Sequence, residues 1–172
     1  MKKKLFNVII LSLVFATVAA MCGCSLTGKS GGTLDEPEIT TEYLTTEYKN
    51  QLIRDGAEEV FGTAELTIDE DGSRRLLIHE KEFVEDDGYP NGFYIADKNM
   101  SREAFLSDDA KATFFDGGSS ISEAMDADEF VNAYKNEEAL YSDEDTSYYE
   151  TKLYYFYIFD DRVNLMIARY IP

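Results

Sequence analysis

Hydrophobic and polar residues alternate along the middle of the chain. Ala64, Leu66 and Ile68 are separated by polar residues, which is typical of a half-buried β-strand. The segment 69–73 follows and reads Asp-Glu-Asp-Gly-Ser, a composition that favours a hairpin turn because glycine readily adopts a positive φ. A return strand is expected over 74–84. The first predicted unit is therefore a β-hairpin.

Turn residues at 86–92 lead into three short predicted strands, over 93–97, 102–107 and 110–115. Asn99 begins the turn that separates the first two strands. A Gly-Gly-Ser segment closes this half of the predicted sheet.

One helix is predicted after these strands. Asp126 precedes Glu129 by the spacing of a capping box, in which each residue bonds the other's backbone amide. The helix is expected to end near Asn136, and 137–147 is expected to be an acidic loop. Apolar residues recur at helical spacing and form a stripe that faces the sheet: Ala127, Phe130, Val131 and Tyr134.

The chain ends in a predicted hairpin of strands 152–159 and 162–170 around Asp160-Asp161. A two-residue turn pairs Phe159 with Arg162 and assigns alternate residues to opposite faces. The face expected in the core carries Tyr154, Phe156, Ile158, Val163, Leu165 and Ile167. The opposite, mixed face carries Leu153, Tyr155, Tyr157, Phe159, Arg162, Asn164, Met166 and Ala168.

The segment 43–54 has two interpretations. Leu44, Tyr48 and Leu52 recur every four residues and favour a short helix, while neighbouring threonines disfavour it.

Meandering strands, one helix and a final hairpin resemble an OB-fold in their order. We therefore expect a mainly β protein, a small OB-like β-barrel with one helix before the C-terminal hairpin, formed by a single domain over 43–172. The body also resembles the single-domain barrels of uncharacterised lipoproteins from Gram-positive bacteria, including the closing aromatic-Ile-Pro end. The alternative is an α+β antiparallel sheet with helices on one face.

The N-terminus reads as a secretory signal peptide over 1–23. Three lysines at 2–4 precede an apolar stretch over 5–21 that polar residues interrupt, which favours a signal over a membrane-spanning helix. The segment Met21-Cys22-Gly23-Cys24 resembles a bacterial lipobox. The resemblance implies cleavage before Cys24 and a lipid on that residue, with Cys22 as the alternative.

Such a lipoprotein would be held in the cell membrane by its fatty acyl chains, on the extracytoplasmic face. Cleavage would remove three lysines and no acidic residue, and would change the net charge from −18 to −21. Gly, Ser, Thr and acidic residues dominate after Cys24, so 24–42 is expected to be a flexible tether of about 20–25 Å.

Composition narrows the possible functions. A net charge of −18 disfavours a nucleic-acid binder, which needs a basic surface. One histidine and two cysteines exclude a disulfide framework and any site that needs two histidines. No cofactor is expected.

Few residues point to catalysis. His79 is expected on the outward face of its strand, without the partner that a general base needs. Ser119 and Ser120 lack a nucleophile-elbow context and are assigned to a loop. Acidic residues are numerous enough for a pair of catalytic carboxylates, although the sequence selects none. A carboxylate-dependent cell-envelope hydrolase therefore remains an alternative.

Calcium binding is a weaker alternative. Asp69 and Asp71 fit the third and fifth positions of an EF-hand loop, but the glutamate at its twelfth position is absent. Asp143 and Asp145 belong to a second acidic run. Either group could take a weakly bound extracellular Ca²⁺, and no defined metal site is predicted.

The mixed face of the final hairpin is the remaining candidate ligand patch: Tyr155, Tyr157, Phe159, Arg162 and Asn164. Flat aromatic rings beside an amide and a guanidinium suit a sugar or a peptide. In the other interpretation this face packs under the N-terminal segment or the acidic loop.

Together these features predict a lipid-anchored extracytoplasmic protein that is not an enzyme and displays a binding or structural domain. Its expected partners are the membrane, through the N-terminal lipid, and an envelope protein, peptide or polysaccharide.

Overall fold

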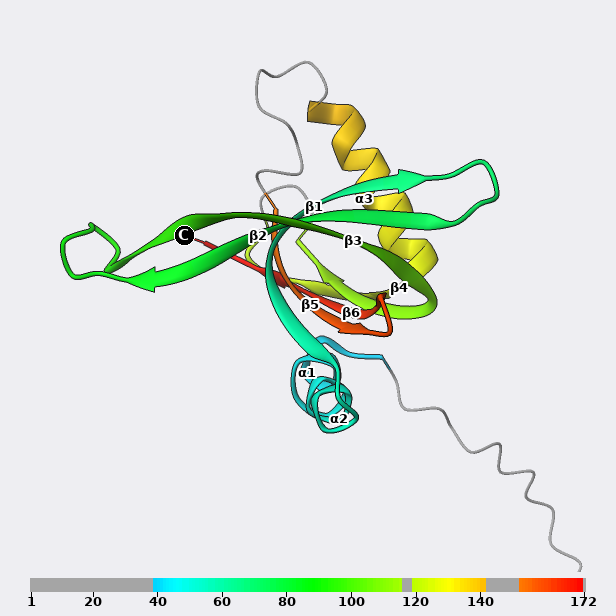
Figure 1. Cartoon of the computed structure of the whole chain (residues 1–172), viewed down its shortest axis with the longest axis horizontal. Coiled ribbons are helices and arrows are strands. Elements are labelled where there is room, and N and C mark those ends of the chain that lie inside the picture. Colours follow the sequence, from blue (N-terminus) through cyan, green and yellow to red (C-terminus); the bar gives the residue numbers. More distant parts are fainter. Residues whose placement is uncertain (1–38, 116–118, 142–151, 172) are drawn as a thin grey trace, which may run out of the picture. The chain divides into compact units, whose positions relative to one another are not determined.

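A computed structural model of the chain describes residues 39–115, 119–141 and 152–171 (Figure 1). The chain divides into two units, 1–36 and 37–172, and all described residues belong to the second. The predicted signal peptide and most of the predicted tether lie outside the described residues.

The segment with two interpretations is helical. It comprises α1 (Thr41–Tyr43), a π-helical turn η1 (Leu44–Tyr48) and α2 (Lys49–Arg54). The hydroxyl of Thr40 accepts a hydrogen bond from the Tyr43 amide and begins the helix, as a cap should. The threonine hydroxyls that disfavoured the helix donate instead to carbonyl oxygens one turn earlier, and so are satisfied within it.

Strands dominate the rest of the described chain, and the predicted mainly β fold is confirmed. The six strands are β1 (Glu58–Ile68), β2 (Arg74–Glu85), β3 (Phe93–Phe114), β4 (Glu123–Asp126), β5 (Leu153–Phe159) and β6 (Arg162–Arg169).

The strand pairings close into a ring. β2 lies between β1 and β3, β1 pairs antiparallel with β5, and β5 pairs antiparallel with β6. β6 runs parallel to β3 and completes the ring, while the short β4 adds to β3 from outside it. This closure, with one helix before the final hairpin, agrees with the main fold prediction. The alternative of an α+β antiparallel sheet is not what forms, because strands dominate and β3 pairs parallel with β6.

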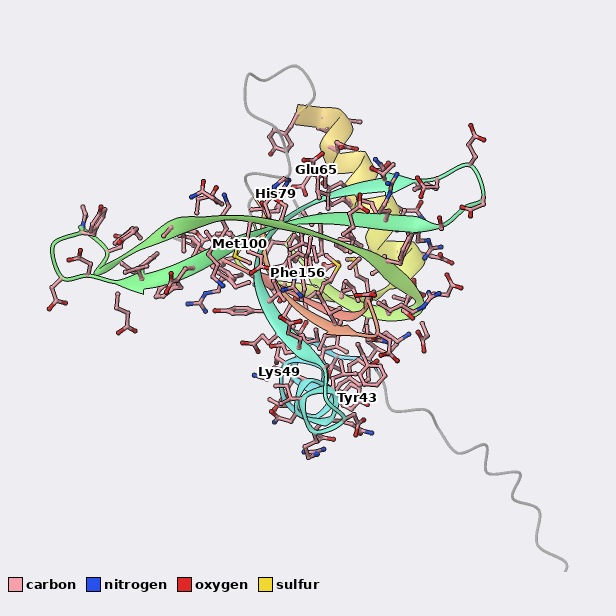
Figure 2. All side chains as sticks on the ribbon, in the orientation of Figure 1. Tyr43, Lys49, Glu65, His79, Met100 and Phe156 are labelled. Carbon is pink, nitrogen blue, oxygen red and sulfur yellow. The ribbon has the colours of Figure 1, made fainter. Side chains whose placement is uncertain are left out.

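The helix α3 (Ala127–Tyr141) packs on the larger hydrophobic cluster (Figure 1). The predicted capping box forms: the Glu129 amide donates to Asp126 Oδ1 at 2.9 Å, and the Asp126 amide donates to Glu129 Oε2 at 3.1 Å. The whole predicted stripe of apolar residues is buried. Phe130 and Phe156 are fully buried in the same cluster, and Figure 2 shows Phe156 among the strands.

The helix continues past its predicted end near Asn136. Glu137, expected in an acidic loop, is a helical residue with 5% of its surface exposed. Its Oε1 accepts a hydrogen bond from Lys152 Nζ at 3.0 Å, so the buried carboxylate is paired with a cation. This long-range partner allows an acidic residue to extend the buried helix face. Residues 142–151 lie outside the described part.

The prediction of three short strands over 93–115 is wrong. They form one long strand, β3, and the turn expected at Asn99 is an irregularity within it. Asn99 does adopt a positive φ of 54°, but the pairing with β2 shifts there and then continues. Such a bulge uses turn-forming residues without reversing the chain.

The final hairpin turns at Asp160 and Asp161, with φ values of 48° and 60°, and pairs Phe159 with Arg162 as predicted. A register shift then pairs Tyr157 with Leu165. Because a one-residue shift exchanges faces, the predicted faces are wrong for β6 beyond Asn164, while those predicted for β5 are confirmed. Met166 lies with the larger cluster, and Leu165 and Ile167 lie with Tyr157 on the opposite side.

Candidate functional site

The predicted aromatic patch is not an open surface. Tyr157 is only 2% exposed, and it forms a second hydrophobic cluster with Leu44 of the helical segment and Leu165 of β6. Tyr155 is half-buried and packs against Phe61, with ring centroids 4.9 Å apart. The alternative interpretation, in which this face packs under the N-terminal segment, is the one that the structure shows.

A hydrogen bond between β5 and β1 also contributes to this packed face. The hydroxyl of Tyr157 donates to Glu59 Oε2 at 2.7 Å. Burial, together with this bond to a carboxylate, raises the pKa of Tyr157 above its usual value. Tyr157 therefore stays neutral, and its role is to attach the helical segment and β1 to the final hairpin.

Of the other three members of the patch, only Phe159 and Arg162 pair with each other across the hairpin. Phe159 and Arg162 are exposed at the tip of the hairpin. Asn164 is part-buried, and its Oδ1 has no hydrogen-bond partner. Asn164 is also the residue skipped where the register shifts. The five residues thus do not present one ligand surface.

His79 has partners that the sequence did not predict. Its Nε2 lies 2.9 Å from Glu65 Oε1, and its Nδ1 lies 3.0 Å from Ser101 Oγ (Figure 2). The three residues come from β1, β2 and β3, which lie side by side. Because a carboxylate only accepts hydrogen bonds, Nε2 donates to Glu65, which leaves Nδ1 as the partner of the Ser101 hydroxyl.

These contacts invite comparison with a Ser–His–acid triad. In that triad the serine bonds Nε2 and the acid bonds Nδ1, whereas here the two nitrogens are exchanged. Ser101 also lies directly opposite His79 in the β-ladder. The contacts therefore hold the imidazole against the sheet, and we assign them no catalytic step.

Asp69 and Asp71, the acidic residues considered as calcium ligands, form hydrogen bonds within and beside the turn between β1 and β2. Asp71 Oδ1 accepts from the backbone amide and the hydroxyl of Ser73, and these bonds lower the pKa of Asp71. Asp69 accepts from Ser73 and from Arg75. Across the described ranges, no group of three or more His, Cys, Asp and Glu residues could hold a metal ion. Asp143 and Asp145 lie outside those ranges.

An ionic cluster fixes the point where β2 and β3 leave the ring. Arg102 donates from Nε to Glu80 Oε1 at 2.8 Å, and its two terminal nitrogens bind Glu58 at 2.8 and 3.0 Å. Glu80 is 5% exposed, and Lys98 approaches its other oxygen at 3.5 Å. The hydrogen bond from Arg102 lowers the pKa of Glu58. This cluster connects β1, β2 and β3 through long-range pairs.

Beyond the ionic cluster, β2 and β3 continue as a two-stranded ribbon, which we call the arm (Lys81–Asp97). Figure 1 shows it extending away from the other strands. Its ladder pairs Lys81 with Asp97 at the base and Glu85 with Phe93 at the tip. No residue from Lys81 to Glu103 is buried.

Aromatic residues cover both faces of the arm. Phe83 stacks on Phe93 on one face, and Tyr89 stacks on Tyr94 on the other, each pair with ring centroids 4.6 Å apart. Arg169 lies over the Phe83 ring at 5.9 Å. Met100, labelled in Figure 2, lies near the base of the arm and is 56% exposed. The arm thus carries partly exposed aromatic residues and has no buried core.

Comparison with family models, curated proteins and solved structures gives no match.

Cys24 and Cys22 lie outside the described residues. Within the described part of the chain, no helix is both long enough and apolar enough to cross a lipid bilayer.

Proposed function

We propose that this protein is a lipid-anchored extracytoplasmic binding protein, that its domain is not catalytic, and that the arm is its binding surface. The aromatic pairs of the arm, in which Tyr89 is exposed and its stacking partner and the Phe83–Phe93 pair are only half-buried, are the observation that carries the binding role. Proteins rarely leave a contiguous apolar surface uncovered unless it contacts a partner.

The physics of an isolated ribbon supports this role. A two-stranded hairpin without a packed face is only marginally stable in water. The arm has aromatic stacking and one ion pair at its base, between Lys81 Nζ and Asp97 Oδ2 at 2.7 Å. An exposed ion pair contributes at most about 1 kcal/mol. A partner that covers the aromatic faces would supply the burial that the arm lacks.

The anchor rests on the N-terminal sequence. Lysines at 2–4, the apolar stretch and the lipobox-like segment ending at Cys24 support it. Cells that produce the full chain and are fed radiolabelled fatty acid should incorporate the label. Cys24→Ala should abolish labelling and release the protein from membranes, while Cys22→Ala should leave both unchanged. Undiminished labelling of Cys24→Ala would disprove the assignment of the lipid to that residue.

The binding role is tested on the full chain in mild detergent. Thermal unfolding is followed with a basic peptide, an acidic peptide, wall polysaccharide or Ca²⁺ in excess. A ligand at 100 times its dissociation constant adds about 2.7 kcal/mol, which is a shift of several degrees in a domain of this size. We expect one ligand class to raise the Tm.

Two tyrosines with the same exposed fraction give a matched comparison. Tyr89 in the arm and Tyr170 outside it are both 48% exposed. Tyr89→Ala should reduce the ligand-induced shift, and Tyr170→Ala should preserve it. If no ligand class changes the Tm, the binding role fails. If only Tyr170→Ala removes the ligand-induced shift in Tm, the arm is not the ligand-binding surface.

A further inference from the structure

The outer edge of β2 is uncovered along the arm. β1 pairs with β2 only from Gly62–Ile68 against Arg74–Glu80, and its preceding residues pair with β5 instead. In the ladders of the described chain, residues 81–85 of β2 pair with β3 alone. An edge of this kind offers backbone groups to a further strand.

The backbone of this edge points the right way for a further strand. The Asp86 amide donates to the Gly92 carbonyl oxygen at 2.9 Å, so Asp86 bonds across the ribbon. Along an antiparallel strand the direction of the backbone groups alternates. The amides and carbonyls of Phe83 and Glu85 therefore point to the uncovered edge, where an incoming strand could bond them.

The negative charge around this edge favours a partner strand that carries positive charge. Glu82, Glu85, Asp86 and Asp87 are exposed, and within the described residues none of them has an ion pair. A second copy would bring the same acidic residues to this edge and carry the same net charge of −18. Like charges on paired strands repel, whereas a basic strand would be attracted.

We infer that β2 accepts an extended basic segment of a partner protein as an additional strand beside residues 81–85. This inference rests on the proposed binding role and specifies its mode and its partner. Backbone hydrogen bonds to Phe83 and Glu85 set the register. Lysine or arginine side chains of the added strand meet the acidic residues, and its apolar side chains cover the aromatic residues.

Three synthetic decapeptides test the mode on the full chain in detergent. One alternates lysine with valine, the second alternates glutamate with valine, and the third is the lysine peptide with two prolines in its centre. We expect the lysine peptide to bind, with an affinity that falls as salt rises, and the glutamate peptide to bind more than about tenfold more weakly. The proline peptide should also bind weakly, because proline cannot donate to a ladder.

Amide hydrogen exchange locates the bound peptide. The lysine peptide should slow exchange at Phe83 and Glu85, and leave exchange in the β1 segment Gly62–Ile68 unchanged. Glu82→Lys combined with Glu85→Lys should weaken the lysine peptide about tenfold and favour the glutamate peptide. Glu42→Lys with Glu47→Lys makes the same change of net charge on the exposed face of the helical segment, and should have little effect.

Several outcomes would overturn the inference. Equal affinities for the lysine and proline peptides would show that electrostatic attraction alone binds them, without addition of a strand. Protection outside the arm would place the peptide elsewhere, and a dimer dispersed by the arm double variant would assign the edge to a second copy. If polysaccharide alone raises the Tm through Tyr89, the binding role survives and the strand mode fails.

Discussion

The C-terminal hairpin and the arm are both antiparallel ribbons rich in aromatic residues, yet they have opposite surroundings. β5 is flanked by β1, and β6 by β3, so both outer edges of the hairpin are paired. Both of its faces are buried, one in the larger cluster and one under the helical segment. The arm has two unpaired edges in the described ladders and no buried residue.

This difference does not come from composition. The aromatic residues of the arm, Phe83, Phe93 and Tyr94, are of the same two types as Tyr154, Phe156 and Tyr157 in the C-terminal hairpin. What differs is whether distant segments reach the ribbon. Aromatic side chains therefore stabilise the fold in one hairpin, and in the other remain available to a partner.

Truncation of one phenylalanine in each hairpin gives the largest expected contrast. Phe156 is fully buried, so Phe156→Ala should lower the free energy of unfolding by about 3–5 kcal/mol. Phe93 is half-exposed and loses mainly its stacking on Phe83, so Phe93→Ala should cost about 1 kcal/mol. Urea unfolding of the full chain in detergent measures both.

Equal losses for the two variants would contradict the comparison, because they would show that the arm belongs to the cooperative core. If Phe156→Ala does not fold, Ile158→Val in β5 and Ile95→Val in the arm replace the pair. Ile158 is 7% exposed, so the loss of one methylene should cost about 1 kcal/mol there, and less at the half-buried Ile95.

The point where β1 leaves β2 gives the next contrast. A Cβ on Gly62 would lie 2.1 Å from the His79 carbonyl oxygen, so Gly62→Ala must move backbone and should cost about 1–3 kcal/mol. A Cβ on Gly88, in the arm loop, would meet only the Asp86 side chain, at 3.1 Å. Gly88→Ala should change stability by less than about 0.5 kcal/mol. Urea midpoints compare the two, and a harmless Gly62→Ala would argue against close strand contact there.

Elements with local signals could be predicted from the sequence. The capping box of Asp126 and Glu129 and the turn at Asp160-Asp161 each depend on neighbouring residues and appear in the structure. The alternation in β1 holds for the buried Ala64 and Leu66, whereas Ile68 at the end of the strand is exposed. The single helix before a final hairpin follows from them. Burial of the apolar stripe on α3 was predictable for the same reason.

Features that depend on distant residues could not be predicted. The bulges at Asn99 and Asn164 follow from how β3 and β6 pair, and they change which side chains share a face. The partners of His79 come from two other strands. The exposure of the arm follows from β1 turning away at Gly62, which no residue of the arm itself encodes.

The buried tyrosines should make the free energy of unfolding depend on pH under alkaline conditions. Burial raises the pKa of Tyr157, with a further contribution from its bond to Glu59, and burial also raises the pKa of Tyr154. A tyrosine with a raised pKa in the folded state contributes stability that is present below the unfolded value of about 10 and is lost as pH rises above it. Each such residue should lower stability by about 1.4 kcal/mol per pH unit there.

Tyr157→Phe keeps the ring and removes the ionisable group, so its stability should decline less steeply between pH 10 and 11.5 than that of the unaltered chain. At pH 7 the variant should lose about 1 kcal/mol, from the missing hydrogen bond to Glu59. Tyr89→Phe, in the exposed part of the arm, should decline as the unaltered chain does, because it removes a hydroxyl from a side chain that folding does not bury. Urea unfolding across this pH range measures all three slopes. Identical slopes for Tyr157→Phe and Tyr89→Phe would mean that Tyr157 reaches solvent, and the hairpin face under the helical segment would then be as open as the arm.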